Sequence, residues 1–428
     1  MDQPKLLQND KQTTEVFPKK LDTFTIINKR FTLSFLMNIG FTIMFSGILL
    51  THGNRCLMSS HEKPENPFLH VSGFLVGYIL SQIPAAWVSL KVSPLIWFGR
   101  SILAHSILLF LIPFIGSIGY GCFAIMKFTE GMVSGTAFVV FNASWKNWTP
   151  AADRSTLITF GFAGRYLGEF FGELLANNCP ELPAWIILSC IIGICGIIWW
   201  FAWNNMVYES PKNHRTISQK EYNEIHSIIQ EEIQPTEGLS CTKIIFSIPC
   251  LVLVIVNVFR AWNRNLHVHT RGDMFACVIK LISFPLAGYF ADILVRKTSL
   301  TRSHVRKLFI SGVFLLEAAY FILLTYAEGM NMGSWFYCIV IFMEILYNAS
   351  VGATIVNAVD IAPSHAGVAA AIMSIFSYSV FLISSKMEIY LRQINWHVAV
   401  HFIAIIGHLL AGVVYGIYGT ANPIGVKH

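Results

Sequence analysis

Charged side chains inside long apolar segments are the residues of this sequence with the most informative chemistry. Lys127 and Glu130 are three residues apart, and Arg165 and Glu169 are four apart, so the members of each pair share one face of a helix. A charge inside an apolar segment is costly to bury, and it usually faces a partner or a water-filled cavity. Four more such charges occur further along the chain: Arg260, Lys280, Glu317 and Glu344.

These charges allow two interpretations. In the first, each pair neutralises itself and limits its own burial cost. In the second, a cavity holds an anion between fixed cations, with Lys127 and Arg260 as the leading candidates, because an anion needs fixed positive charge and directional donors. Arg165, Tyr78 and Tyr166 would complete the binding site, the tyrosines by donating hydrogen bonds from otherwise apolar rings. Candidate coupling or gating acids are Glu130, Glu169, Glu344 and Asp292.

No constellation typical of a soluble enzyme occurs in the sequence. It contains no Walker-type phosphate loop, which argues against ATP-driven pumping, and no cluster of cysteines and histidines with metal-ligand spacing. We therefore expect no enzyme activity, no metal and no organic cofactor, although H⁺ or Na⁺ could serve as a coupling ion. The net charge of +6 reflects basic loops at one membrane face, and we do not expect it to bind nucleic acid.

The composition shows what must position these side chains. Of all residues 54% are hydrophobic and only 13% are charged, whereas soluble domains are about 25% charged. Phe31 to Leu50 contains no charged residue and is long enough to cross a bilayer as a helix. The sequence thus predicts an all-α polytopic membrane protein with about twelve spans: 31–50, 68–90, 98–116, 119–142, 155–176, 182–206, 244–262, 274–295, 308–327, 333–358, 366–388 and 396–418.

One long polar stretch divides these spans into six and six. We expect an N-terminal tail at 1–30, a six-helix bundle at 31–206, a linker at 207–243, a second bundle at 244–418 and a tail at 419–428. A weak internal repeat supports the division: AGYFADILVRK at 287–297 corresponds to AAWVSLK at 85–91, which lacks the acid. Two related six-helix halves around a central site are typical of secondary transporters.

Lysines and arginines in short loops predict the orientation. They concentrate in the N-terminal tail and in the loop at 296–307, which places both termini in the cytosol. The sequons at Asn142 and Asn147 then face the cytosol and stay unused. Cys56 and Cys179 fall in predicted outer loops and could pair.

Several stretches, in chain order, resemble the anion-transporter branch of the major facilitator superfamily, which includes sialin, vesicular glutamate transporters and type I sodium–phosphate transporters. The most specific are GYILSQIP at 77–84, YESP at 208–211 and NAVDIAP at 357–363. The resemblance implies a twelve-helix fold and a small anionic substrate moved by alternating access. It also implies a monomer in the plasma membrane or in a lysosomal or vesicular membrane.

The resemblance also assigns individual residues. A substrate-recognising arginine of the family matches Arg260, whereas a second one is replaced by Lys127, and a glutamate associated with proton coupling is replaced by Ser134. The interval from Trp262 to Asp292 is also shorter than the family pattern. These departures favour the alternative of a non-transporting relative that acts as a membrane scaffold or sensor.

Overall fold

The computed structural model describes residues 28–52, 68–116, 118–150, 152–177, 182–233, 238–263, 274–327, 335–394 and 396–425. Cys56 and Cys179 lie outside them, so their pairing stays a prediction. Over the described residues the chain is helical, without strands. Ten helices there are long and apolar enough to cross a membrane. The expected all-α polytopic membrane fold is confirmed.

The first half of the chain forms six long helices, each close to its predicted range. They are α1 (Lys29–His52), α3 (Phe68–Lys91), α4 (Pro94–Gly116), α5 (Tyr120–Ala143), α6 (Arg154–Asn177) and α7 (Leu182–Met206). A short 3-10 turn, η1 (Ser144–Asn147), follows α5. Helix α6 is the one that is not apolar enough to be a candidate span, because Arg165, Glu169 and Glu173 fall within it.

The second half also forms six long segments. They are α10 (Ile248–Asn263), α11 (Met274–Lys297), a continuous run of α12 (Arg302–Lys307), η5 (Leu308–Gly312) and α13 (Val313–Ala327), then α14 (Trp335–Ile361), α15 (Ala366–Gln393) and α16 (His397–Tyr418). Helix α10 has 16 residues. The residues that follow it, 264–273, lie outside the described ranges, so the expected shortening after Trp262 stays a prediction.

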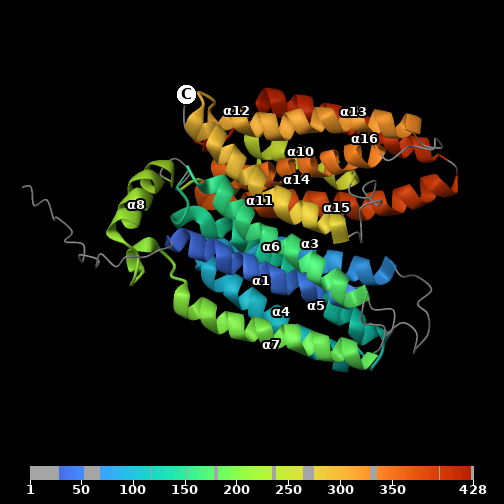
Figure 1. Cartoon of the computed structure of the whole chain (residues 1–428), viewed down its shortest axis with the longest axis horizontal. Coiled ribbons are helices and arrows are strands. Elements are labelled where there is room, and N and C mark those ends of the chain that lie inside the picture. The colour runs from blue at the N-terminus through green and yellow to red at the C-terminus, as the bar shows by residue number, and fades with distance from the viewer. Residues whose placement is uncertain are drawn as a thin grey trace, which may run out of the picture.

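The two sets of six helices lie side by side with their axes roughly along the long axis of the molecule (Figure 1). The blue-to-green first bundle occupies the lower part of the view and the yellow-to-red second bundle the upper part. The connection between them contains η2 (Pro211–Asn213), α8 (Gln219–Ile233) and α9 (Cys241–Ile245). Helix α8 lies at the same end as the C-terminus, and we call this end the linker side.

Small residues let the bundles pack closely. A Cβ atom on Gly164 of α6 would lie 1.9 Å from the carbonyl oxygen of Asn38 in α1, so only glycine permits this contact inside the first bundle. A Cβ atom on Gly288 of α11 would lie 2.6 Å from the carbonyl oxygen of Ser155 in α6, so the same applies between the bundles. The second contact holds α6 and α11 together along the seam between the two halves.

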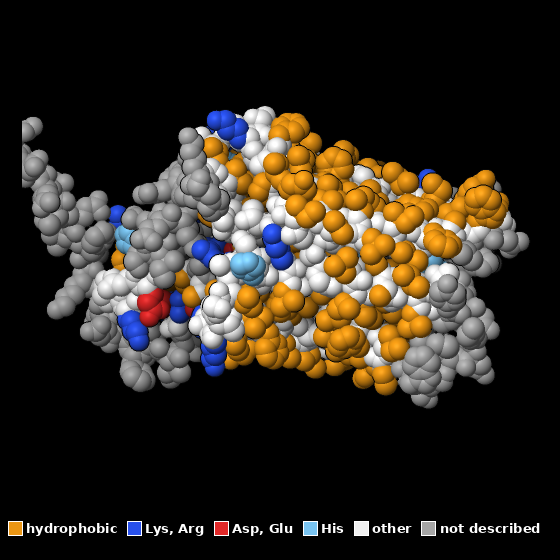
Figure 2. All heavy atoms as spheres, turned by 90° about the horizontal axis from the view of Figure 1, so that it is seen from above, with side chains coloured by type: hydrophobic (Ala, Val, Ile, Leu, Met, Phe, Trp, Pro, Cys, Tyr) orange, Lys and Arg blue, Asp and Glu red, His pale blue; other side chains and the backbone are white. Residues whose placement is uncertain are grey.

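The outer surface is apolar over most of its length. Figure 2 shows hydrophobic side chains covering the long flank, with blue and red side chains gathered towards the linker side. Large apolar side chains such as Leu80, Ile83 and Ile198 are exposed on the surface of the molecule. A flank of this kind suits contact with lipid rather than water, since exposed apolar area is unfavourable in water.

Candidate functional site

A cavity of ≈ 560 Å³ lies between the two bundles. Its walls come from α1, α3, α5 and α6 of the first half and from α10, α11, α14 and α15 of the second. Six of the residues singled out from the sequence line it together: Tyr78, Arg165, Tyr166, Glu169, Arg260 and Glu344. They come from four different helices, so the fold collects them from positions up to hundreds of residues apart.

Arg260 is the cation in this cavity whose hydrogen-bonding partners are neutral. Its guanidinium donates to the hydroxyl of Thr354 over 3.1 Å and to the hydroxyl of Ser350 over 2.5 Å, both on α14. The guanidinium carbon also lies 4.9 Å from the centre of the Phe314 ring and 5.8 Å from that of Tyr347. Among the described residues no carboxylate forms an ion pair with Arg260, so its charge is available to a ligand.

The other two cations that line the cavity are paired with acids. Arg165 Nε lies 2.7 Å from Glu169 Oε1, as their spacing on α6 predicts. Lys280 Nζ of α11 lies 3.2 Å from Glu344 Oε1 of α14, a contact that no sequence spacing indicates. Each pair largely cancels its own charge inside the cavity.

Tyrosines border the same space. The ring centre of Tyr78 in α3 lies 4.3 Å from that of Tyr378 in α15, so the two residues meet across the seam between the bundles. Tyr166 packs edge-on against Phe284 of α11 with ring centres 5.2 Å apart. Sequence analysis did not identify Tyr378, Ser350 or Thr354. The one available signal was the four-residue spacing of the two hydroxyl residues on α14.

Lys127 and Glu130 lie elsewhere, inside the first bundle. Lys127 Nζ is 2.6 Å from Glu130 Oε2 and donates over 2.7 Å to Thr51 Oγ1 of α1, and His105 Nδ1 of α4 is 3.9 Å from Glu130 Oε1. Neither residue lines the cavity, although Ser134, one to two turns further along α5, does. The physical reason is the position of α1, whose Phe45 and Leu49 face the cavity while Thr51 faces Lys127.

A similar buried pair lies inside the second bundle. His408 Nε2 of α16 is 3.3 Å from Glu317 Oε2 of α13, and the side chains of both residues are 2% exposed. The His408 ring stacks on Phe314 with centres 4.7 Å apart, and Phe314 also contacts Arg260. The acid and the histidine therefore lie behind the cavity wall rather than in it.

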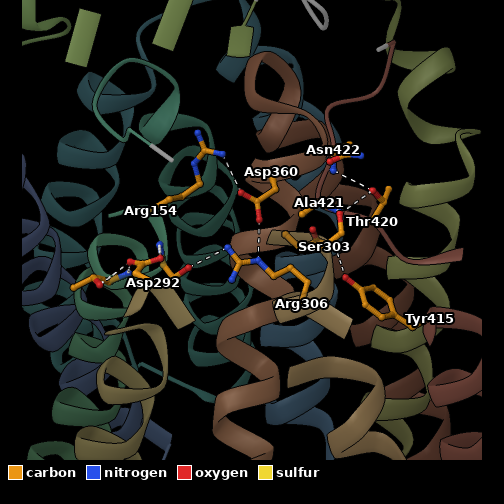
Figure 3. A network of polar contacts seen from close by, with 12 residues as sticks. Arg154, Asp292, Ser303, Arg306, Asp360, Tyr415, Thr420, Ala421 and Asn422 are labelled. Carbon is orange, nitrogen blue, oxygen red and sulfur yellow. Dashed lines mark hydrogen bonds and ion pairs between the residues drawn. The ribbon is translucent and has the colours of Figure 1, made fainter. Parts of the chain in front are cut away.

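Asp292 belongs to a polar network that joins the bundles on the linker side (Figure 3). Its carboxylate accepts hydrogen bonds from the backbone nitrogens of Ser155 and Thr156 over 3.2 and 2.7 Å. Carboxylates at the start of a helix are stabilised by the free N–H groups and the helix dipole there. Asp292 thus attaches the end of α11 to the start of α6.

Arginines complete the network. Arg154 Nη1 of α6 lies 2.9 Å from Asp360 Oδ1 of α14, and Arg306 Nε of α12 lies 2.8 Å from Asp360 Oδ2. Arg306 also donates to the hydroxyl of Ser155 over 3.0 Å, so it reaches both Asp360 and the start of α6 in Figure 3. These buried contacts close the linker side of the seam. The cavity instead extends to Leu49 and Glu173, near the opposite ends of α1 and α6.

Comparison with known proteins identifies the architecture. The family model of the Major Facilitator Superfamily matches residues 31–385. The chain belongs to the Major Facilitator Superfamily.

Curated relatives of this superfamily member are vesicular glutamate transporters. It is 26% identical to vesicular glutamate transporter 3 of Danio rerio over 92% of this chain and 73% of the relative. It is 25% identical to vesicular glutamate transporter 1 of Xenopus laevis over 92% of this chain and 75% of the relative. The family model makes the chain a transporter-type protein, and these relatives resemble it as its motifs predicted.

Solved structures of the superfamily share the fold. A bacterial homologue of the iron transporter ferroportin in an outward-facing state superimposes with a TM-score of 0.64 at 12% identity, covering 90% of this chain and 98% of that one. The fucose:proton symporter of Escherichia coli superimposes with a TM-score of 0.59 at 11% identity, covering 90% and 97%. At such identities these superpositions show the fold alone.

Proposed function

We propose that this superfamily member is a secondary active transporter of small organic or inorganic anions that carry a carboxylate or a phosphate. One observation carries the proposal. Arg260 lies buried in a cavity between the two halves, with hydroxyl and aromatic partners and no carboxylate paired to it among the described residues. A buried cation without a counter-ion is costly. An anionic substrate would offset that cost.

The other charges of the cavity suit a single negative charge on the substrate. Arg165 and Lys280 are each within ion-pair distance of an acid, so Arg260 remains as the uncompensated charge. Glu169 and Glu344 are placed to exchange a proton or to release their partner when the substrate binds. The coupling ion would be H⁺ or Na⁺, or the membrane potential would drive transport directly.

Alternating access would use the contacts at the two ends of the seam. The network around Asp360 and Asp292 closes the linker side, while the cavity reaches towards the other side. We infer that the linker side is cytosolic and that the structure represents an outward-facing state of a monomer. The residue limits 31–206 and 244–418 are our proposal for the two moving halves.

Transport assays in sealed vesicles would test the proposal. The purified chain is reconstituted, and uptake of labelled glutamate, sialate, urate and phosphate is compared with that of Arg260→Ala. Arg215→Ala serves as the matched control, because Arg215 is an exposed arginine of the linker, away from the cavity. We expect at least one anion to accumulate in vesicles with the wild-type and control proteins and not with Arg260→Ala. If no anion accumulates above the Arg260→Ala level, the non-transporting alternative of a membrane scaffold or sensor is favoured.

A further inference from the structure

A second cavity, of ≈ 440 Å³, lies on the linker side of the seam. Its walls include the end of α3, the turn η1, the linker at Glu209 and Gly238, and the turn η6 (Pro363–His365) before α15. It therefore spans both halves of the protein. None of its lining residues belongs to the central cavity or to the network around Asp360.

Several side chains that line the cavity are donors suited to an anion. Lys91 in the last turn of α3 and Lys146 in η1 contribute two positive charges, and hydroxyl groups of Ser93 and Ser144 lie among them. One carboxylate, that of the exposed Glu209, also borders the cavity. The two lysines outnumber it, and a volume of this order accommodates a small-molecule ligand.

His365 gives an independent indication of a missing ligand. The residue is 9% exposed, and its Nδ1 atom is buried without a hydrogen-bond partner among the described residues. A buried polar atom without a hydrogen-bond partner costs free energy. A ligand that hydrogen-bonds Nδ1 in this cavity would remove that cost.

The internal repeat explains why the site is polar and open. In the second half, Asp292 at the end of α11 accepts hydrogen bonds from the start of α6. In the first half, the end of α3 packs in the same way against the start of α15, since a Cβ atom on Gly367 would lie 2.5 Å from Ser89 Oγ. The corresponding stretch at 85–90 ends in Leu90 instead of an acid. The start of α15 therefore receives no carboxylate from this position.

We propose that a phosphate group occupies this cavity in place of the missing carboxylate, held by Lys91, Lys146 and His365 near the start of α15. The free N–H groups and the dipole at a helix start add to the attraction for an anion. The phosphate would belong either to a soluble phosphate ester or to a lipid headgroup, which could enter beside the exposed Trp87 and Val92. Since the walls come from both halves, the occupant stabilises the closed linker side.

Binding measurements on the purified full chain distinguish a soluble phosphate ester from a lipid headgroup as the source of the phosphate group. The first probe is inositol trisphosphate in solution, and the second is phosphatidylcholine vesicles with and without a phosphatidylinositol phosphate. Lys91→Gln and Lys146→Gln are each expected to weaken binding about fivefold, from roughly 1 kcal/mol per lysine at a phosphate-rich surface. Lys243→Gln is the control, because Lys243 is an exposed lysine of the same face outside the cavity.

A further variant restores the acid of the repeat. Leu90→Asp places a carboxylate at the position of Asp292 in the other half, and it should abolish phosphate binding while the protein stays folded. Binding of the soluble probe identifies a soluble ester, and binding only to the phosphoinositide vesicles identifies a headgroup. The proposal is overturned if neither probe binds, or if both lysine variants and Leu90→Asp bind as well as Lys243→Gln.

Discussion

Replacing Arg154 by glutamine should open the linker side of the central cavity. Arg154 contributes an ion pair of 2.9 Å to Asp360 across the seam, and both side chains are buried. Asp360 keeps Arg306, a partner from its own half, so the substitution leaves no buried carboxylate unpaired. The interaction lost is specific to the state closed on this side, and therefore its loss shifts the balance between conformations rather than unfolding one bundle.

The magnitude follows from the type of contact. A hydrogen bond to a charged group contributes about 1.5–3 kcal/mol. A loss of about 2 kcal/mol changes the ratio of the two conformations about 30-fold. If the state open on the linker side is a minor one, access to the cavity from that side rises by nearly this factor.

Cys277 provides the reporter, since it lines the central cavity. A membrane-impermeant maleimide is added from the linker side of sealed vesicles, and modification of Cys277 is followed by peptide mass spectrometry. We expect the rate in Arg154→Gln to rise about 30-fold, with Arg154→Lys in between. Arg215→Gln, a change of an exposed linker arginine, should label like the wild type. An unchanged rate in a folded Arg154→Gln protein would refute the role of this ion pair in closing the seam.

Three further predictions concern other sites. Lys127→Met leaves Glu130 buried without its cation, so we expect a stability loss of about 3–5 kcal/mol in thermal unfolding. A second change, Glu130→Gln, should largely restore the lost stability. An unchanged Tm in the Lys127→Met variant would contradict this prediction. Glu169→Gln removes the acid paired with the α6 arginine, so the KM for a transported anion should fall several-fold, while the equivalent change at the exposed Glu224 of α8, outside both cavities, should leave it unaltered. Asn142 is 0% exposed and its side chain donates to a backbone carbonyl, so glycosidase treatment should cause no mass shift in its peptide, and any shift there would disprove the proposed placement of this segment.

The spans could be read from the sequence because length and apolarity suffice for them. A helix must satisfy its own backbone hydrogen bonds in lipid, so a long apolar segment has one structural solution. Helix α6 was predicted as well, although Arg165 and Glu169 interrupt its apolar pattern and it is not apolar enough to be a candidate span. Ion pairs within one helix could also be predicted, because the spacing of the two residues alone brings them together. The 2.7 Å contact between Arg165 and Glu169 is an example.

The side of each helix that points towards the cavity could not be predicted from the sequence in this way. Helices such as α5 and α14 are apolar on nearly all sides, because lipid and protein neighbours both present apolar surfaces. The sequence therefore suggested that Lys127 lines the cavity with Arg260, whereas the structure places Lys127 behind α1. The role of Lys127 in substrate binding stays a prediction.

The sequence by itself determined which segments cross the membrane and which charges they carry into it, since these follow from local composition. Only the tertiary structure decided which charges share a space. Lys280 and Glu344 are paired, and Arg260 has no acid paired to it among the described residues. Asp360 joins arginines from both halves. The physical reason is that such contacts depend on how helices far apart in the chain are rotated and tilted against one another. Close packing of the bundles sets that arrangement.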